Sequence, residues 1–346
     1  MLRPTVHDVA RVANVSLSTV DRVLNGRDGV RAATRERVRA AMRELGYERD
    51  IMAANLSRKR VYKVHFTLPE GPNSFMRNLA EEVRAQAREA ARDRTRISIS
   101  TVPPFDGRAL AADLRRLRDA APEAVPDGVV VVATDAAEVR QAVSELRGAG
   151  IEVITLVSDL PASARSRFVG IDNVSAGRTA AGLLGRFCRG QEGRIAIVAG
   201  SMLLRDHVER RLGFEQVMHA EFAHLAPMPP IEGRDAADEV ERRVSEALEA
   251  QPDIVGIYSL GGGNGGLQRA LLRVSPTPRP MVVAHELTEQ SRHALQDGVF
   301  DAVLHQDIGH EVRSALDILR ALIDATPVEA GRGLIRTEIF LRDNLP

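Results

Sequence analysis

The sequence predicts an all-α head followed by an α/β body of two lobes, each a doubly wound parallel sheet. Two short amphipathic segments at helical spacing lie within the first 24 residues. From Tyr62, short β-branched runs alternate with long amphipathic stretches, which is typical of parallel strands joined by crossover helices. The alternation starts again after Asp172 and Asn173, and 346 residues are enough for two or three domains.

The head is predicted from the stretch Thr5 to Leu24, which reads as two short helices separated by a tight turn. Apolar residues recur on one face of each helix, at Val9, Ala10 and Ala13 and again at Val20, Val23 and Leu24. Ser16 is the expected N-cap of the second helix, which leaves Leu17, Ser18 and Arg22 outward. A helix-turn-helix protein inserts this face into the major groove of DNA. The stretch therefore predicts a DNA-reading head, and the alternative is a helical pair inside an ordinary globular domain.

A third helix is expected from Ala32 to Leu45, which completes a head of residues 1–47. Residues 48–61 are expected to form a linker in which Asp50 to Arg58 reads as a short helix. A helix of this length is marginal in water, so we expect it to fold only with a partner.

The body, residues 62–346, is predicted to form the two lobes. The first lobe is expected to contain residues 62–174 and 306–333, and the second lobe residues 175–305 and 334–346. The later strand near Asp301 to His305, the helix 309–325 and a final strand from Leu334 to Leu341 are expected to exchange between the lobes. Three crossings would form a hinge, with a ligand cleft between the lobes at the carboxyl ends of the strands.

The distribution of charge distinguishes the head from the body, and the cysteine content bears on the redox state of the compartment. The net charge is zero, but residues 1–60 hold 13 Lys or Arg against 7 Asp or Glu, so they carry +6 and the remainder −6. A basic end suits contacts with phosphates. Cys188 is the only cysteine, which excludes an intramolecular disulfide and fits a reducing compartment. Neither a membrane-spanning apolar run nor an apolar signal region is present, so we expect a cytoplasmic protein.

Several motifs occur together near the N-terminus: T-V-H-D-V-A, V-S, T-V-x-R-V-L-N, T-R-E-R-V and L-G-Y. On these motifs the chain resembles the lactose and galactose repressor family, closely over the first 60 residues and more loosely to Pro346. The resemblance implies a repressor-type transcription regulator that binds a near-palindromic double-stranded DNA operator as a homodimer or a tetramer. Its body would resemble the type I periplasmic sugar-binding proteins and bind a small effector, a monosaccharide or polyol.

The resemblance also assigns residues to DNA. The family's DNA-binding positions fall on Thr5, Ser16, Leu17, Ser18, Thr19, Arg22, Asn25, Tyr47, Asn55 and Leu56. Leu56 matches a hinge-helix leucine that enters a minor-groove step and bends the DNA, and the alternative is a linker leucine packed on the body. The chain departs from the family at Asp21 and Arg31, where small hydroxyl residues are common.

In the body, the resemblance places effector contacts at Phe75, Asp135, Asp159, Arg210, Asn264, Glu286 and Gln306. Arg210 begins the pattern R-x-x-G-F, which in relatives marks an arginine that reaches ligand hydroxyls. Asp135 and Asp159 follow predicted strands, where carboxylates can accept hydrogen bonds from a sugar. The alternatives are a helix N-cap for Asp135 and a turn before Pro161 for Asp159.

Aromatic residues make up 3% of the chain and there is no Trp, which weakens the case for a sugar. Stacking against a sugar ring would rest on Phe75, Tyr258 or Phe300. A nucleobase or another small polar metabolite therefore remains an alternative effector.

A glycine-rich loop from Gly261 to Gly266 raises an alternative function. It satisfies G-x-G-x-x-G after a predicted strand, with Glu286 20 residues further on, as in dinucleotide-binding sites. The alternative is a nucleotide-dependent enzyme fused to a DNA-binding head. Against it, the loop lies in the middle of the second lobe rather than at the start of a mononucleotide-binding half. Without a G-x-S-x-G elbow or metal-ligand spacing among the histidines, we expect no catalysis, cofactor or metal.

Overall fold

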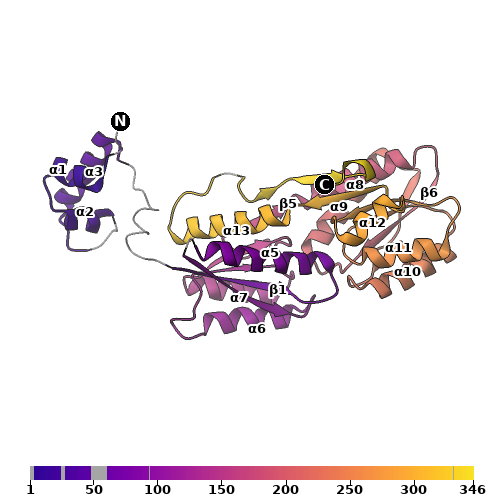
Figure 1. The fold of residues 1–346 in the computed structure, drawn as a ribbon, viewed down its shortest axis with the longest axis horizontal. Helices are drawn as coiled ribbons and strands as arrows, with labels where there is room; N and C mark the ends of the chain where they lie inside the picture. The colour runs from indigo at the N-terminus through magenta and orange to yellow at the C-terminus, as the bar shows by residue number, and fades with distance from the viewer. Residues whose placement is uncertain (1–3, 25–27, 48–60, 93, 330) are drawn as a thin grey trace. The chain divides into compact units, whose positions relative to one another are not determined.

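The computed structural model describes residues 4–24, 28–47, 61–92, 94–329 and 331–346 (Figure 1). The chain divides into two compact units, residues 1–60 and 61–346, which are described separately. The predicted DNA contacts Asn25, Asn55 and Leu56 and the predicted hinge helix lie outside the described residues.

The head contains three helices, α1 (Val6–Val12), α2 (Leu17–Leu24) and α3 (Ala32–Leu45). Thr5 and Asp8 form a capping box at the start of α1, and the Ser16 hydroxyl accepts a hydrogen bond from the Thr19 backbone N–H at 3.3 Å. Apolar residues of all three helices form one small core, centred on Val9, Val20 and Val38. The predicted helix pair and its Ser16 cap are therefore present.

The first lobe is a parallel six-stranded sheet in the order β12-β5-β4-β3-β1-β2. Its strands are β1 (Tyr62–Pro69), β2 (Thr95–Val102), β3 (Gly128–Val131), β4 (Glu152–Leu156), β5 (Arg167–Ile171) and β12 (Leu334–Ile335). Helices α5 (Ser74–Ala90) and α13 (Ile308–Ile323) cover one face of the sheet, and α6 (Gly107–Arg118) and α7 (Ala137–Gly148) cover the other (Figure 1). Because both faces are covered, the central strands β1 and β3 are buried almost along their whole length.

The second lobe is a seven-stranded sheet in the order β13-β11-β10-β9-β6-β7, with β8 also paired to β6. Its strands are β6 (Gly193–Ala199), β7 (Leu225–Pro227), β8 (Ile231–Glu232), β9 (Ile254–Ser259), β10 (Met281–His285), β11 (Ala302–Gln306) and β13 (Thr337–Phe340). Its helices are α8 (Asn173–Phe187), α9 (Arg205–Glu221), α10 (Ala237–Ala250), α11 (Asn264–Val274) and α12 (Glu289–Gln296), followed by a 3-10 turn at Arg342–Asn344. The predicted class, a helical head and two α/β lobes, is confirmed, although the short strands β7 and β8 were not expected.

The end of the chain corrects one prediction. The expected single strand from Leu334 to Leu341 is two strands: β12 pairs with β5 in the first lobe, and β13 pairs antiparallel with β11 in the second. Ile335 is buried in the core of the first lobe, while Arg336 between the two strands is exposed. Pairing with the free edges of two different sheets decides this division, and local sequence does not encode it.

The chain crosses between the lobes three times, and each crossing passes through one exposed residue. These residues are Asp172 between β5 and α8, Asp307 between β11 and α13, and Arg336 between β12 and β13. Both aspartates cap the helix that follows, accepting hydrogen bonds from Ser175 N and His310 N. Such short crossing segments are suited to act as a hinge.

Helices α8 and α9 pack with their backbones in contact at two reciprocal glycines. A Cβ atom on Gly177 would lie 1.9 Å from the carbonyl oxygen of Arg210, and one on Gly213 would lie 2.0 Å from that of Val174. These distances leave no room for a methyl group, so the glycines fix the position of α9 and of the Arg210 backbone.

We expect Gly177→Ala to force α8 and α9 apart and to lower the free energy of unfolding by about 1–3 kcal/mol. Gly148→Ala is the matched control, because a Cβ at this exposed last position of α7 would meet no atom within 4 Å. Urea unfolding followed by circular dichroism measures both variants. Equal stabilities of the two would contradict the close packing of α8 on α9.

Candidate functional site

A cleft between the two lobes lies at the carboxyl ends of their strands. The first lobe contributes Asn73, Ser74, Phe75, Met76 and Val157, and the second contributes Leu204, Asp206, His207, Arg210, Asp235, Gly261, Gly262, Gly263, Asn264, His285, Glu286, Thr288 and Gln306. The volume between these walls, including the part open to solvent, is about 460 Å³. The centre of a water-sized sphere fits into only about 30 Å³ of it. That space holds roughly two water molecules, so the lobes lie close together.

Arg210 on α9 is the buried cation of this cleft, with only 3% of its surface exposed. Its Nε donates to Asn173 Oδ1 and its Nη1 to the Leu260 carbonyl, both at 2.9 Å. Its Nη2 lies 3.6 Å from Glu286 Oε1 and has no hydrogen-bond partner among the described residues. The Nη2 amino group of a fixed guanidinium is thus left to bind something else.

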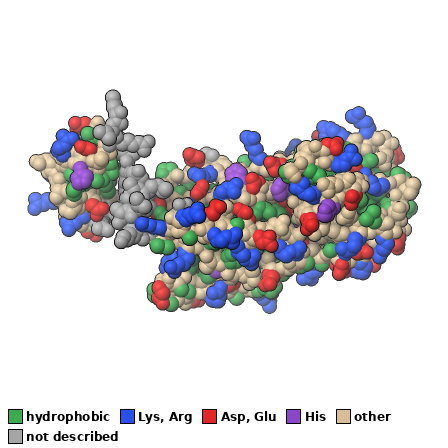
Figure 2. Space-filling model, in the orientation of Figure 1, with side chains coloured by type: hydrophobic (Ala, Val, Ile, Leu, Met, Phe, Trp, Pro, Cys, Tyr) green, Lys and Arg blue, Asp and Glu red, His purple; other side chains and the backbone are tan. Residues whose placement is uncertain are grey.

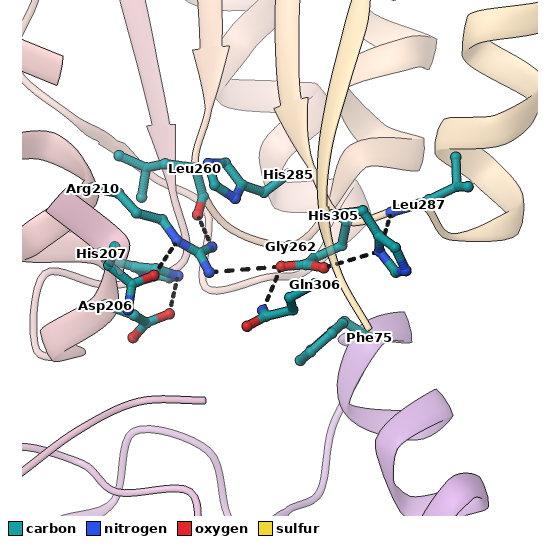
Figure 3. A network of polar contacts seen from close by, with 12 residues as sticks. Phe75, Asp206, His207, Arg210, Leu260, Gly262, His285, Leu287, His305 and Gln306 are labelled. Carbon is teal, nitrogen blue, oxygen red and sulfur yellow. Dashed lines mark hydrogen bonds and ion pairs between the residues drawn. The ribbon is translucent and has the colours of Figure 1, made fainter. Parts of the chain in front are cut away.

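The carboxylate that faces Arg210 belongs to Glu286, the residue after β10. Its Oε1 accepts a 2.6 Å hydrogen bond from Gln306 Nε2, and His305 Nδ1 lies 3.5 Å away from Oε2. Glu286 Oε2 and Gln306 Oε1 are both buried and have no hydrogen-bond partner within the described part of the chain. Figure 3 shows Arg210, His305 and Gln306 converging, with Phe75 facing them from the start of α5.

Three non-glycine residues with left-handed backbones line the cleft: Val157 in the first lobe, and Asp235 (φ 56°) and Glu286 in the second. Val157 follows β4 with φ 65°, and Glu286 follows β10 with φ 69°. For residues with a side chain this conformation costs about 1 kcal/mol or more, and such strain gathers at binding sites. The two strand ends are therefore held in unusual geometry at the place where the lobes meet.

Asn264 and His285 also line the cleft and hydrogen-bond within the protein, although His285 Nδ1 has no hydrogen-bond partner among the described residues. Asn264 accepts from Ser259 Oγ at 2.7 Å and donates to the His285 carbonyl at 2.8 Å, so its amide orders the two strand ends. Tyr258 OH lies 2.8 Å from His285 Nε2, and burial lowers the pKa of this histidine well below its usual 6.5. His285 is therefore a neutral ring at physiological pH.

Neither Tyr258 nor Phe300, expected as stacking partners for a sugar, is available in the cleft. Tyr258 is completely buried and stacks on Phe214 at 4.6 Å, and Phe300 lies in the core beneath α10, α11 and α12. Phe75 is the one aromatic side chain among the described residues that line the cleft.

The two predicted first-lobe carboxylates also lie elsewhere. Asp135 is ion-paired with Arg140, and Asp159 with Arg165, whose Nη2 is 2.6 Å from Asp159 Oδ2. Neither lines the cleft, and the N-cap position of α7 is Ala136 rather than Asp135. Arg140 on α7 and Arg165 in the loop after β4 pair with the two aspartates, a pairing that was not weighed in the sequence analysis.

The structure adds two carboxylates that the sequence analysis missed. Asp206 is buried, and its Oδ1 has no hydrogen-bond partner among the described residues. Asp235 accepts from Asn73 Nδ2 of the first lobe and from the Gly262 backbone N–H, both at 2.8 Å, and so joins the two lobes. Asp206 precedes Arg210 by four residues on one helix face, a signal that was available in the sequence.

The glycine-rich loop takes its composition from packing. Gly263 caps α11 with φ 87°, a Cβ on Gly261 would lie 2.6 Å from Gly200 N, and a Cβ on Gly266 would lie 1.8 Å from the Ala237 carbonyl oxygen. The strand-to-helix turn and the contact of α11 with α10 account for all three positions of the motif.

In the head, the first turn of α2 presents its side chains to solvent. Leu17 is 43% exposed, and Ser18 and Arg22 are exposed as well. The Ser16 hydroxyl lies 2.9 Å from both Ser18 Oγ and Thr19 Oγ1. Of the other predicted DNA contacts, Thr5 is exposed and Tyr47 half-buried. An exposed leucine beside a small hydroxyl cluster is a surface that can contact base edges.

Over the larger unit, Figure 2 shows Lys and Arg interspersed with Asp and Glu across the visible face. Among the described helices, none is both long enough and apolar enough for a membrane span. Within the same residues, no group of three His, Cys, Asp or Glu side chains could hold a metal ion.

Glu311 in the first turn of α13 is a buried acid near the cleft. It is completely buried, and neither carboxyl oxygen has a hydrogen-bond partner in the described part of the chain. Burial, with the nearby charge of Glu286, raises the pKa of Glu311 well above 4.5. The folded chain therefore keeps this proton at neutral pH, whereas the unfolded chain has released it. As pH rises above about 4.5, Glu311 consequently lowers the free energy of unfolding.

We expect Glu311→Gln, which keeps the uncharged shape, to gain stability relative to the wild type between pH 5 and pH 8, by up to about 1.4 kcal/mol per pH unit. Urea unfolding at both pH values measures the difference. Glu249→Gln on the exposed face of α10 is the control and should show no such trend. A constant difference between wild type and Glu311→Gln would mean that the acid is charged in the fold.

Two family models match the chain, one over the head and one over the body. Residues 5–50 match the model described as bacterial regulatory proteins, lacI family, and residues 64–327 match a periplasmic binding protein domain. The HTH-type transcriptional regulator pepR1 of Lactobacillus delbrueckii subsp. lactis and catabolite control protein A of Priestia megaterium are each 38% identical over 79 residues, which is 23% of this chain and 24% of theirs. These alignments thus span about a quarter of the relatives' length.

Solved structures resemble the body. GanP, a glucose-galactose binding protein from Geobacillus stearothermophilus, has a TM-score of 0.73 at 19% identity and covers 83% of this chain and 99% of its own. A putative LacI transcriptional regulator from Bacteroides fragilis has a TM-score of 0.70 at 17% identity and covers 82% of this chain and 98% of its own. At these identities the likeness shows the fold. Over residues 64–327 this chain belongs to the periplasmic binding protein domain family, and its head, residues 5–50, matches the lacI family of bacterial regulatory proteins.

Proposed function

We propose that the chain is a sequence-specific, DNA-binding transcription repressor controlled by a small polyhydroxylated effector, a monosaccharide or polyol, bound between the two lobes. The observation that carries the proposal is the set of unsatisfied polar atoms in the cleft. Arg210 Nη2 can donate, and Asp206 Oδ1, Glu286 Oε2 and Gln306 Oε1 can accept. Vicinal hydroxyl groups donate and accept at once, so a sugar can satisfy both kinds of group.

The apolar part of the cleft also favours a sugar over a nucleobase. Phe75 and Val157 present one ring and one branched aliphatic side chain from the first lobe. A sugar offers an apolar C–H face to such a wall, whereas a nucleobase is usually held between two flat groups. The solute-binding protein from Burkholderia graminis, solved in complex with D-arabinose, has the same fold at 21% identity and a TM-score of 0.73, and covers 82% of this chain and 96% of its own.

Effector entry requires the lobes to move. A monosaccharide is several times larger than the roughly two waters that the cleft admits, so binding must involve opening and closing about the crossing residues Asp172, Asp307 and Arg336. An effector that binds the open and closed forms unequally shifts their populations. In a cytoplasmic homodimer, this shift would change the spacing of the two heads and with it operator affinity.

The first prediction from this proposed function concerns the cleft. Arg210→Ala should weaken effector binding by about 2 kcal/mol or more, roughly 30-fold, because ligand hydroxyls lose a buried donor. A thermal-shift screen of monosaccharides and polyols identifies the ligand, and calorimetric titration measures its affinity. Asp159→Asn is the matched control and should bind as the wild type, because Asp159 pairs with Arg165 outside the cleft. Equal effects of the two substitutions would remove Arg210 from the site.

The second prediction concerns the head. Replacing Leu17 and Ser18 together should change the preferred DNA sequence, because their side chains are exposed at the start of α2. Arg35→Ala should instead weaken binding to all sequences alike, as expected for a phosphate contact. Selection of binding sites from a random DNA pool separates the two results. An unchanged sequence preference in the double variant would exclude α2 as the reading helix.

A further inference from the structure

A second cavity lies beside the polar cleft and has no role in the proposed recognition of hydroxyl groups. It is formed by the loops that follow β1 and β2, by Val132 and Thr134 after β3, and by Leu204 and Arg234 from the second lobe. Counted out to solvent, its volume is about 530 Å³, but, as in the polar cleft, the centre of a water-sized sphere fits into only about 30 Å³ of it. Most of its exposed wall is apolar, although Glu70, Arg234 and Asp235 also line it.

Rigid residues form the wall on the side of the first lobe. Pro69, Pro72, Pro103 and Pro104 all line the cavity, and their backbones have a fixed φ. Phe105 completes the wall with φ 61°, a left-handed conformation that is costly for a residue with a side chain. Walls that are already rigid lose little conformational entropy when a ligand binds against them.

The two cavities are contiguous. Asn73, Met76, Leu204 and Asp235 line both of them. The hydrogen bond from Asn73 Nδ2 to Asp235 Oδ2, 2.8 Å long, joins the lobes at this shared boundary. Both cavities lie between the lobes, so opening of the lobes would widen them together.

We propose that this apolar cavity is a subsite for an apolar substituent of the effector, so that the preferred ligand is a glycoside with an apolar aglycone rather than a free monosaccharide. The inference rests on the proposed function, since it places the sugar ring against Arg210 and Glu286. The aglycone then lies against the prolines and Phe105. Apolar contact with these walls, once the lobes have opened to admit the ligand, is expected to tighten binding on the order of 10-fold.

The test compares matched ligands on the full-length protein by calorimetric titration. Each of several sugars, glucose, galactose, xylose and arabinose among them, is supplied as the methyl and the phenyl glycoside. For the sugar that binds, we expect the phenyl glycoside to bind on the order of 10-fold more tightly than the methyl glycoside. Equal affinities of the two glycosides would overturn the subsite and leave the sugar-binding cleft intact.

Two variants test whether the gain in affinity from the phenyl group arises in this cavity. Val102→Phe, at the half-buried end of β2, fills the apolar cavity and should abolish the preference for phenyl while leaving methyl glycoside affinity unchanged. Pro104→Asp places a charge in the same wall and should do the same if Val102→Phe does not fold. A preference for phenyl that survives in the folded variants would overturn the assignment to this cavity. Failure of every free sugar and glycoside to bind would overturn both the subsite and the sugar effector.

Discussion

The buried guanidinium of Arg210 is the constraint on which the arrangement of the body depends. A charge that is 3% exposed must be paired and hydrogen-bonded, and here the protein supplies Asn173, the Leu260 carbonyl and the carboxylate of Glu286. The contact of α8 and α9 at Gly177 and Gly213 fixes the position of the Arg210 backbone. The geometry of the site therefore depends both on the packing of α8 against α9 and on the residues at the strand ends.

The partners of Arg210 also connect the site to the hinge. Asn173 follows the first crossing residue, Asp172, and Gln306, which donates to Glu286, precedes the second, Asp307. Asn173 and Gln306 are direct sequence neighbours of two of the three crossing residues. A ligand that drew these side chains together would therefore act beside the crossing segments. Asn73 and Asp235 add a direct hydrogen bond across the cleft. The proposed ligand contacts thus lie beside the segments that cross between the lobes, as the proposed coupling between cleft and head requires.

The sequence predicted most of the fold because helical periodicity and β-branched runs are local properties of the chain. Arg210, Glu286, Gln306 and Phe75 were expected at one cleft, and the structure brings them together because parallel strands end at one edge of each sheet. Their contact with an effector stays a prediction.

Other features depend on contacts that local pattern does not encode. Asp135 and Asp159 follow strands as expected, but neighbouring arginines hold them in their own loops. The division of the last strand at Arg336 follows from the free edges of two sheets. Asp235 approaches Asn73 across 162 positions of sequence, a distance over which periodicity carries no information.

The most direct measurement is operator affinity of the full chain, by fluorescence anisotropy of a labelled DNA duplex, without sugar and with a saturating concentration of a sugar that raises the melting temperature. We expect operator affinity to change by at least about 5-fold, and sugar affinity to change by the same factor when operator is saturating, because coupling between two binding sites is reciprocal. An operator affinity that stays the same at saturating sugar would contradict control of the head by the cleft.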